Sequence, residues 1–269
     1  TGAFTLSGTN VSGDVSIVVA AGATNTVTLS NLALMETGDY QCAFAVETNA
    51  HVSLVLAGTN SLISGFDRAG LEVATDGTLS ITNAPGDDAA SLTAMGFCGV
   101  GIGVESDENG DSGTVIINGG KITAIGDDDS AGIGGGYFGD GGTVAINGGT
   151  VTAIGGDYAA GIGGGNNGGG CAVEISGGTV SATGGENGAG IGGGESGTGG
   201  TITINGGMVT ATGGENGAGI GGGHLANGGM TTISGGTVTA TGGICGAGIG
   251  GGYFGNGALV TLSGGTVTA

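Results

Sequence analysis

The sequence predicts an all-β fold, a right-handed parallel β-helix (β-solenoid) with three short strands in each coil of about 29 residues. Three observations predict it. Short segments that alternate apolar and polar residues recur with a constant step, as strands do. Gly-rich segments separate them, and the 3.6-residue periodicity of helices is missing. The string AGIGGG begins at Ala131, Ala160, Ala189, Ala218 and Ala247, always 29 residues apart.

Each repeat contains three strand-like pieces, typified by TVAING, TVTATGG and AGIGGG. If one repeat forms one coil, equivalent residues of successive coils lie about 4.8 Å apart, at the spacing of hydrogen-bonded strands. Five inward columns of apolar residues then run along the stack and form one narrow core. The columns begin at Val115, Ile117, Ile122, Ala124 and Ile133.

We expect a single solenoid domain over residues 1–269, with irregular N-terminal coils and a cap in 1–112 and regular coils in 113–269. In the irregular part the column of Ile117 continues backward as Ile81, Leu56 and Leu29. The last repeat stops at Ala269 without a polar cap, so we expect an uncapped C-terminal end with unpaired strand edges. Such edges favour end-to-end or side-by-side self-association.

The composition narrows the classes of partner. Gly accounts for 73 of 269 residues, but 38% of the chain is hydrophobic at fixed positions, which argues against disorder. The net charge is −20, and Arg68 and Lys121 are the two basic residues. This charge argues against nucleic acid, since phosphate binding needs clustered Lys and Arg, and against docking on anionic membranes. No apolar run approaches the roughly 20 residues of a membrane helix. Thr1 follows no basic n-region, so we expect any signal peptide to be removed or to lie outside this sequence.

The four cysteines, Cys42, Cys98, Cys171 and Cys245, form no CxxC pair, which argues against a zinc site. Cys42 and Cys98 fall about two coils apart, roughly 9–10 Å at the strand spacing, too far for a disulfide. We therefore expect four free thiols. In an extracellular protein, free thiols favour an anaerobic or otherwise reducing habitat.

The segments GTNSLISG, AGLEV, GTLSIT and SLTA, followed by tandem GGTVTATGGxxGAGIGGG units, resemble a Gly-rich repeat region of large bacterial surface proteins. Such proteins are common in anaerobic gut Firmicutes and Bacteroidetes and are described as carbohydrate-binding or adhesin-like. The resemblance covers nearly the whole chain. It implies an extracellular right-handed β-helix, similar in shape to pectate-lyase-like proteins, and it carries over no catalytic residues.

A threonine face is the first candidate binding surface. The outward positions of TVTAT form three ranks, about 6.6–7 Å apart along the strand and about 4.8 Å apart between coils. This flat array resembles the ice-binding face of β-solenoid antifreeze proteins. Lys121, Met208, Ile125 and Ile154 interrupt it, and Thr is also simply favoured on exposed strands. The candidate residues are Thr150, Thr152, Thr179, Thr183, Thr210, Thr212, Thr237, Thr239 and Thr241.

Two further surfaces are candidates. Asp128, Asp157, Glu186 and Glu215 form an acidic column, which predicts either solvated carboxylates or a Ca²⁺ site, since calcium takes several oxygen ligands. No other cofactor is expected. The loop after AGIGGG forms a column of Tyr137, Asn166, Glu195, His224 and Tyr253. Exposed aromatic rings among polar groups suit sugar stacking, although packing within the loops explains them equally well.

Catalysis is poorly supported, because His51 and His224 fall on different coils and no tuned acid–base pair is apparent. The sequence therefore predicts an extracellular, cell-surface, non-enzymatic module, an adhesin or stalk that binds polysaccharide or another extracellular surface. The alternative is an ice-binding protein that uses the threonine face. A third reading is a β-helix polysaccharide lyase or hydrolase, for which Arg68 would be the one arginine available.

Overall fold

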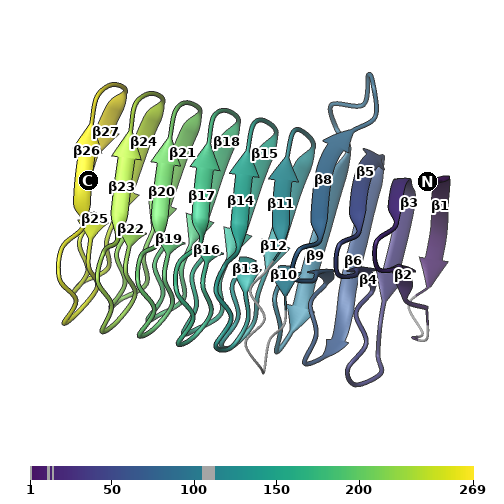
Figure 1. Ribbon diagram of the computed structural model, residues 1–269, viewed down its shortest axis with the longest axis horizontal. Coiled ribbons are helices and arrows are strands. Elements are labelled where there is room, and N and C mark those ends of the chain that lie inside the picture. Colours follow the sequence, from purple (N-terminus) through teal and green to yellow (C-terminus); the bar gives the residue numbers. More distant parts are fainter. Residues whose placement is uncertain (1, 11–12, 14, 105–112) are drawn as a thin grey trace.

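A computed structural model describes residues 2–10, 13, 15–104 and 113–269. Within these ranges the chain forms strands and loops and no helix. The coils stand side by side along the long axis of a rod, with the two termini at opposite ends (Figure 1). All pairings between the named strands are parallel, and they build two sheets, one of 18 strands and one of nine. The all-β solenoid prediction is confirmed, and the right-handed winding stays a prediction.

The strands form three ladders, which successive coils extend in the same order. The first and second ladders begin with the two halves of β1 (Gly2–Asn10) and β3 (Thr24–Met35). The first continues through β5 (His51–Ala57), β8 (Thr78–Asn83), β11 (Thr114–Ile117), β14 (Thr143–Ile146), β17 (Ala172–Ile175), β20 (Thr201–Ile204), β23 (Met230–Ile233) and β26 (Leu259–Leu262).

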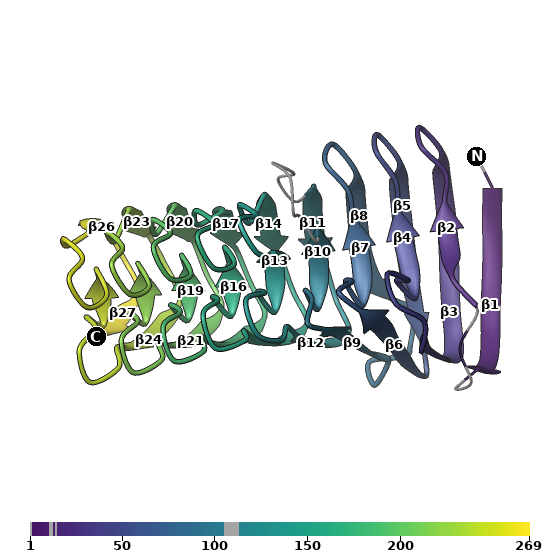
Figure 2. The same ribbon diagram turned by 90° about the horizontal axis from the view of Figure 1, so that it is seen from below.

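The second ladder follows the first around each coil, and the third closes the coil on the side seen in Figure 2. The second comprises β6 (Thr59–Phe66), β9 (Ser91–Phe97), β12 (Lys121–Ile125), β15 (Thr150–Ile154), β18 (Thr179–Thr183), β21 (Met208–Thr212), β24 (Thr237–Thr241) and β27 (Thr266–Thr268). The third comprises β2 (Ile17–Val19), β4 (Phe44–Val46), β7 (Leu71–Val73), β10 (Ile102–Val104), β13 (Ile133–Gly135), β16 (Ile162–Gly163), β19 (Ile191–Gly192), β22 (Ile220–Gly221) and β25 (Ile249–Gly250).

The 29-residue register is confirmed in the regular coils. Val151 pairs with Val180 in the second ladder, and Ile162 pairs with Ile191 in the third. These inward side chains are buried and belong to one hydrophobic core that runs through the coils. Inward residues such as Val260 and Leu262 of the last coil are exposed, because no further coil covers them in this structure.

The expected continuation of the Ile117 column into the N-terminal coils is wrong by two residues. Ile117 pairs with Ile81 as expected, but Ile81 pairs with Leu54, and Leu54 pairs with Val27. Leu56 and Leu29 pair with each other and are fully buried one inward position further along. The strands β3 and β5 are longer than their regular counterparts, so a two-residue shift keeps the same side chains inside.

In the regular coils, the third ladder depends on glycine at the position that follows its isoleucine. At Gly192 the φ angle is 139°, and an added Cβ would overlap the carbonyl oxygen of Gly221 in the next coil. Both the left-handed backbone and the close approach of neighbouring coils therefore exclude a side chain. The same position holds Gly134, Gly163, Gly221 and Gly250 in the other regular coils.

Candidate functional site

The loop column is present as predicted, with one residue on each regular coil. The backbone N–H of the residue after each member donates to the carbonyl of the next member. Phe138 donates to Asn166 at 2.8 Å, and Leu225 donates to Tyr253 at 2.8 Å. Tyr137 and Tyr253, at the two ends of the column, are both exposed.

A second column, which sequence reasoning missed, lies directly beside the loop column and comprises Asp129, Tyr158, Asn187 and Asn216. The N–H of His224 donates to the carbonyl of Asn187, and the N–H of Tyr253 to that of Asn216, both at 2.8 Å. Partners in the two columns are 37 residues apart, so the 29-residue repeat gives no direct signal for this contact. We call the two columns together the seam.

Polar side chains connect the C-terminal part of the seam. Asn216 Nδ2 donates to Asn187 Oδ1 at 2.8 Å, and Asn187 Nδ2 donates to Glu195 Oε2 at 2.8 Å. The other oxygen of Glu195 lies 3.4 Å from His224 Nδ1, close enough for an ion pair but without hydrogen-bond geometry. The imidazole ring stacks on Tyr253 with ring centroids 5.8 Å apart and planes at 15°.

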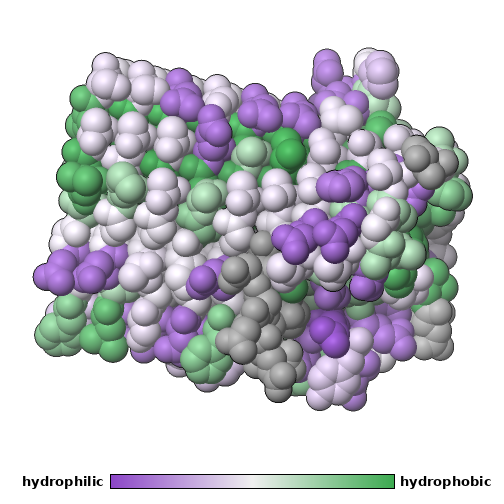
Figure 3. Space-filling view, in the orientation of Figure 1, coloured by the Kyte–Doolittle hydropathy of each residue, from purple (hydrophilic) through white to green (hydrophobic). Residues whose placement is uncertain are grey.

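Beyond the seam, a row of residues adopts left-handed backbone without being glycine. Phe138, Leu225 and Phe254 have φ angles of 57°, 61° and 61°. Their side chains are 54%, 52% and 73% exposed, and each phenylalanine packs on the tyrosine before it. Figure 3 shows hydrophobic side chains at the lower left of the molecule, interrupted by hydrophilic ones, over the loops that follow the third ladder. Asn167 and Ser196 occupy this left-handed row on the two coils between Phe138 and Leu225.

The acidic column stands next to the seam, since Asp128 and Asp157 each precede a seam residue in the chain. The N–H of Tyr158 donates to the carbonyl of Asp128 at 3.2 Å, and that of Asn187 to the carbonyl of Asp157 at 2.9 Å. All four carboxylates of the column are exposed. Across the described ranges, no three of them converge as metal ligands, so calcium binding by this column stays a prediction.

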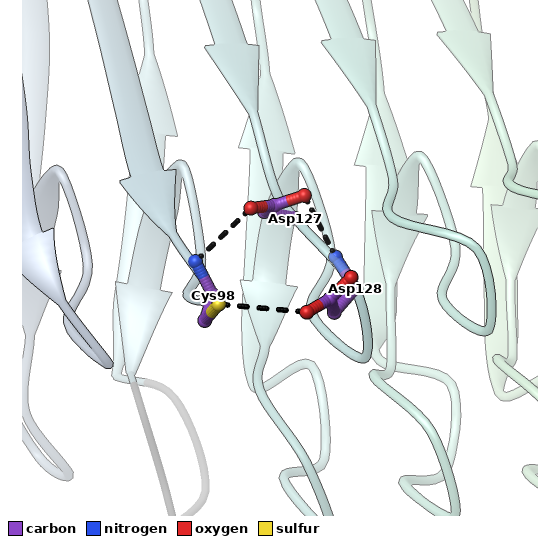
Figure 4. Close-up of side chains that lie close together, drawn as sticks. All are labelled: Cys98, Asp127 and Asp128. Atoms are coloured by element: carbon purple, nitrogen blue, oxygen red, sulfur yellow. Dashed lines mark hydrogen bonds between the residues drawn. The ribbon is translucent and has the colours of Figure 1, made fainter.

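One of the four, Asp128, instead meets Asp127 and Cys98, the one potential group of three metal ligands in the part of the chain that the structure describes (Figure 4). Asp127 Oδ2 accepts the N–H of Cys98 at 3.2 Å, and the Cys98 thiol donates to Asp128 Oδ2 at 3.4 Å. Desolvation, followed by this hydrogen bond, raises the pKa of the Cys98 thiol to about 11. The backbone N–H and the thiol of Cys98 each bond one carboxylate, which accounts for the close approach of the three side chains.

The threonine face has the predicted ranks. Thr150, Thr179 and Thr237 are exposed in the first rank, whereas Thr152 and Thr239 of the middle rank are half-buried. The remaining candidates lie on the same face: Thr183, Thr210 and Thr241 are exposed, and Thr212 is half-buried. The hydroxyl ranks also extend into the N-terminal coils, where Thr93 pairs with Thr123 and Ser61 pairs with Thr93.

The third rank of this face changes character toward the N-terminus, which sequence reasoning also missed. Ile154 pairs with Ile125, which pairs with Met95, and the rank continues through Ile63 to Met35. Here the rank borders an apolar groove of about 440 Å³, whose walls include Phe66 and Phe97. The irregular steps of these coils hid this continuation.

Residues considered for catalysis are not brought together. His51 lies on β5 in the N-terminal coils, whereas His224 lies in the seam. Arg68 Nε donates to the carbonyl oxygen of Tyr40 at 3.3 Å. All four cysteines are free, as predicted. Among the described residues there is no helix with the length and apolar character needed to cross a membrane.

Comparison with known proteins identifies the repeat. Comparison with curated proteins and with solved structures gives no match. A family model described as a beta helix repeat matches residues 115–137, 144–166, 173–195, 202–224 and 232–253. Each matched segment begins in the first ladder and ends on a residue of the loop column. The regular coils therefore match beta helix repeats, and the structure of the chain is a tandem-repeat β-helix.

Proposed function

We propose that this β-solenoid is an extracellular, non-enzymatic surface module, of adhesin or stalk type, that binds polysaccharide along the seam. The observation that carries the proposal is the left-handed row. Phe138, Leu225 and Phe254 keep bulky apolar side chains exposed at backbone angles that glycine adopts without strain. Left-handed backbone costs a bulky residue roughly 1–2 kcal/mol, and an exposed side chain recovers little of this by burial. Contact with a ligand would explain why these side chains are present.

The spacing of the aromatic rings suits a polymer. The pairs Tyr137–Phe138 and Tyr253–Phe254 lie four repeats apart, which is about 19 Å at the strand spacing. A monosaccharide cannot reach both pairs, whereas an extended polysaccharide along the rod axis meets both. Sugar rings stack on exposed aromatic faces, because both surfaces are flat and partly apolar.

Polar groups accompany the rings at the C-terminal end of the seam. His224 stacks on Tyr253, and Glu195 stands beside His224 in the chain of hydrogen bonds that starts at Asn216. Ligand sites typically combine apolar surface with a few fixed polar groups that select orientation. This end of the seam has both properties.

The test is a pull-down on insoluble polysaccharides with a variant that removes the row, Phe138→Gly together with Leu225→Gly and Phe254→Gly. Glycine relieves the backbone strain, so the variant should fold at least as well as the parent and lose glycan binding. Tyr40→Gly is the matched control, since Tyr40 has φ 61° and is 62% exposed away from the seam. Undiminished binding by the triple variant would contradict the proposal.

Ice binding is the second candidate function, favoured by the axial register of the hydroxyl ranks. Thr123, Thr152 and Ser181 pair in register on adjacent coils, and the rank continues through Thr210, Thr239 and Thr268. Thermal hysteresis at micromolar protein is the measurement. A freezing-point depression that Thr152→Tyr abolishes would favour this candidate over the seam.

A further inference from the structure

We propose that the ligand of the seam is an amine-bearing polysaccharide, whose ammonium groups lie over the acidic column while its sugar rings stack on the aromatic side chains. This inference rests on the proposed function and names the chemical class of its ligand. Three observations support it. The acidic column lies beside the seam, no basic side chain of the described residues pairs with its carboxylates, and the column runs parallel to the line that joins the two aromatic pairs.

The acidic column lies immediately beside the second column of the seam, whose members pair with the loop column. Asp157 precedes Tyr158 in the chain, and Glu215 precedes Asn216, whose carbonyl accepts the N–H of Tyr253. The acidic column and the seam are therefore directly adjacent on each of these coils. The carboxylates of Asp157 and Glu215 are exposed, so a ligand on the seam can reach them.

Basic side chains do not neutralise these carboxylates. Within the described ranges, the one contact at ion-pair distance is the 3.4 Å approach of His224 Nδ1 to Glu195 Oε1 inside the seam. Arg68 Nε contacts the carbonyl of Tyr40, and Lys121 lies on β12 in the second ladder. A net charge of −20 on a chain with two basic residues repels polymers of uronic acids or sulfated sugars and attracts cationic ones.

The acidic column and the aromatic pairs are both arranged along the rod axis. Carboxylates recur about every 4.8 Å along the column, parallel to the line that joins the two aromatic pairs. A polymer with regularly spaced amino groups can therefore meet several carboxylates while its rings reach both pairs. A single cationic sugar would gain neither advantage, so the inference specifies a polymer as well as a charge.

Three matched polymers test the charge of the ligand: chitosan, whose amino groups are protonated at mildly acidic pH, chitin, its neutral acetylated counterpart, and the polyanion polygalacturonate. We expect binding to chitosan at least about tenfold tighter than to chitin in about 0.05 M NaCl. The difference should shrink in about 0.5 M NaCl, because salt screens exposed charges. Polygalacturonate should not bind.

Two double variants locate the effect. Glu186→Gln with Glu215→Gln removes two carboxylates of the column and should weaken chitosan binding by roughly three- to tenfold, with chitin binding unchanged. Glu47→Gln with Glu174→Gln removes the same charge from other parts of the rod, after β4 and on β17. The control pair should change chitosan binding by less than about twofold.

The outcomes separate this inference from the proposed function. Equal binding to chitin and chitosan, or equal effects of the two double variants, would overturn the amine-bearing ligand and leave a polysaccharide-binding seam. Tighter binding to polygalacturonate in the presence of calcium would also overturn it and would assign the column to calcium. No binding to any of the three polymers, together with none in a wider glycan pull-down, would sink both proposals.

Discussion

Within the regular coils, Thr231 is the one polar member of the inward column that runs through Val144, Val173 and Ile202. Its side chain is fully buried between Ile202 of the coil before and Val260 of the coil after. Its hydroxyl oxygen has no hydrogen-bond partner among the described residues. Leaving a buried hydroxyl unsatisfied costs about 1–3 kcal/mol. Thr231→Val has nearly the same shape and should therefore raise the free energy of unfolding by about 1–3 kcal/mol.

The reverse substitution supplies the control. Val144 occupies the same column three coils earlier and is also fully buried. Val144→Thr should lower the free energy of unfolding by about 1–3 kcal/mol. The two sites lie about 14 Å apart at the strand spacing, so their effects should add and the double variant should resemble the parent.

Urea unfolding followed by far-ultraviolet circular dichroism gives the sign and size of each effect. Because a solenoid responds coil by coil, hydrogen exchange at β20 and β23 gives the local effect of Thr231→Val. A lower midpoint for Thr231→Val, or an unchanged one for Val144→Thr, would refute the reasoning. Either result would mean that this core accommodates an inward hydroxyl without the desolvation penalty.

Two other predictions concern the backbone and the thiols. Gly192→Ala should lower the free energy of unfolding in urea by about 2–6 kcal/mol, because backbone strain and overpacking combine. Gly257→Ala is the control, since an added Cβ there meets open space, and should change the free energy of unfolding by less than about 0.5 kcal/mol. Similar urea midpoints for the two variants would contradict this prediction. Burial raises the pKa of the Cys42 and Cys171 thiols from 9.0 to about 12. The folded state therefore keeps protons that the unfolded state releases, so this contribution is complete below about pH 9 and is lost as the pH rises toward 12. Unfolding at several pH values should show a steeper alkaline decline for the parent than for Cys42→Ala with Cys171→Ala, and parallel declines would count against it.

The fold of the regular coils is predictable because one period governs every inward position. Val151 lies over Val180 because each coil must present the same packing surface to the next. The prediction failed at Leu56 and Leu29, where the period changes and longer strands allow a shift of two residues without exposing the core. Alternation along a strand distinguishes inside from outside but does not distinguish one inward position from the next.

The candidate site was predictable in one direction only. A constant period identifies axial neighbours, so the column from Tyr137 to Tyr253 follows directly from the sequence. Lateral neighbours depend on the path of the loops, so the contacts of Asn187 with His224 and of Cys98 with Asp127 are apparent only in the three-dimensional structure. The left-handed backbone at Phe138 and Phe254 was hidden for the same reason, since phenylalanine is not a residue that signals such a turn.

The inward columns are uniform along the rod and the loop columns vary, for different physical reasons. An inward column must stay uniform, because a change on one coil leaves a cavity or an overlap against two neighbours. In a loop column only the backbone must match the neighbouring coils, so the side chains are free to differ. The loop column reads Tyr, Asn, Glu, His and Tyr, whereas the core column beside it reads isoleucine on all five coils. A surface of identical coils would offer a ligand many equivalent registers. The aromatic pairs at the two ends and the His224–Glu195 contact between them break that equivalence, and so they can fix one position for a bound chain.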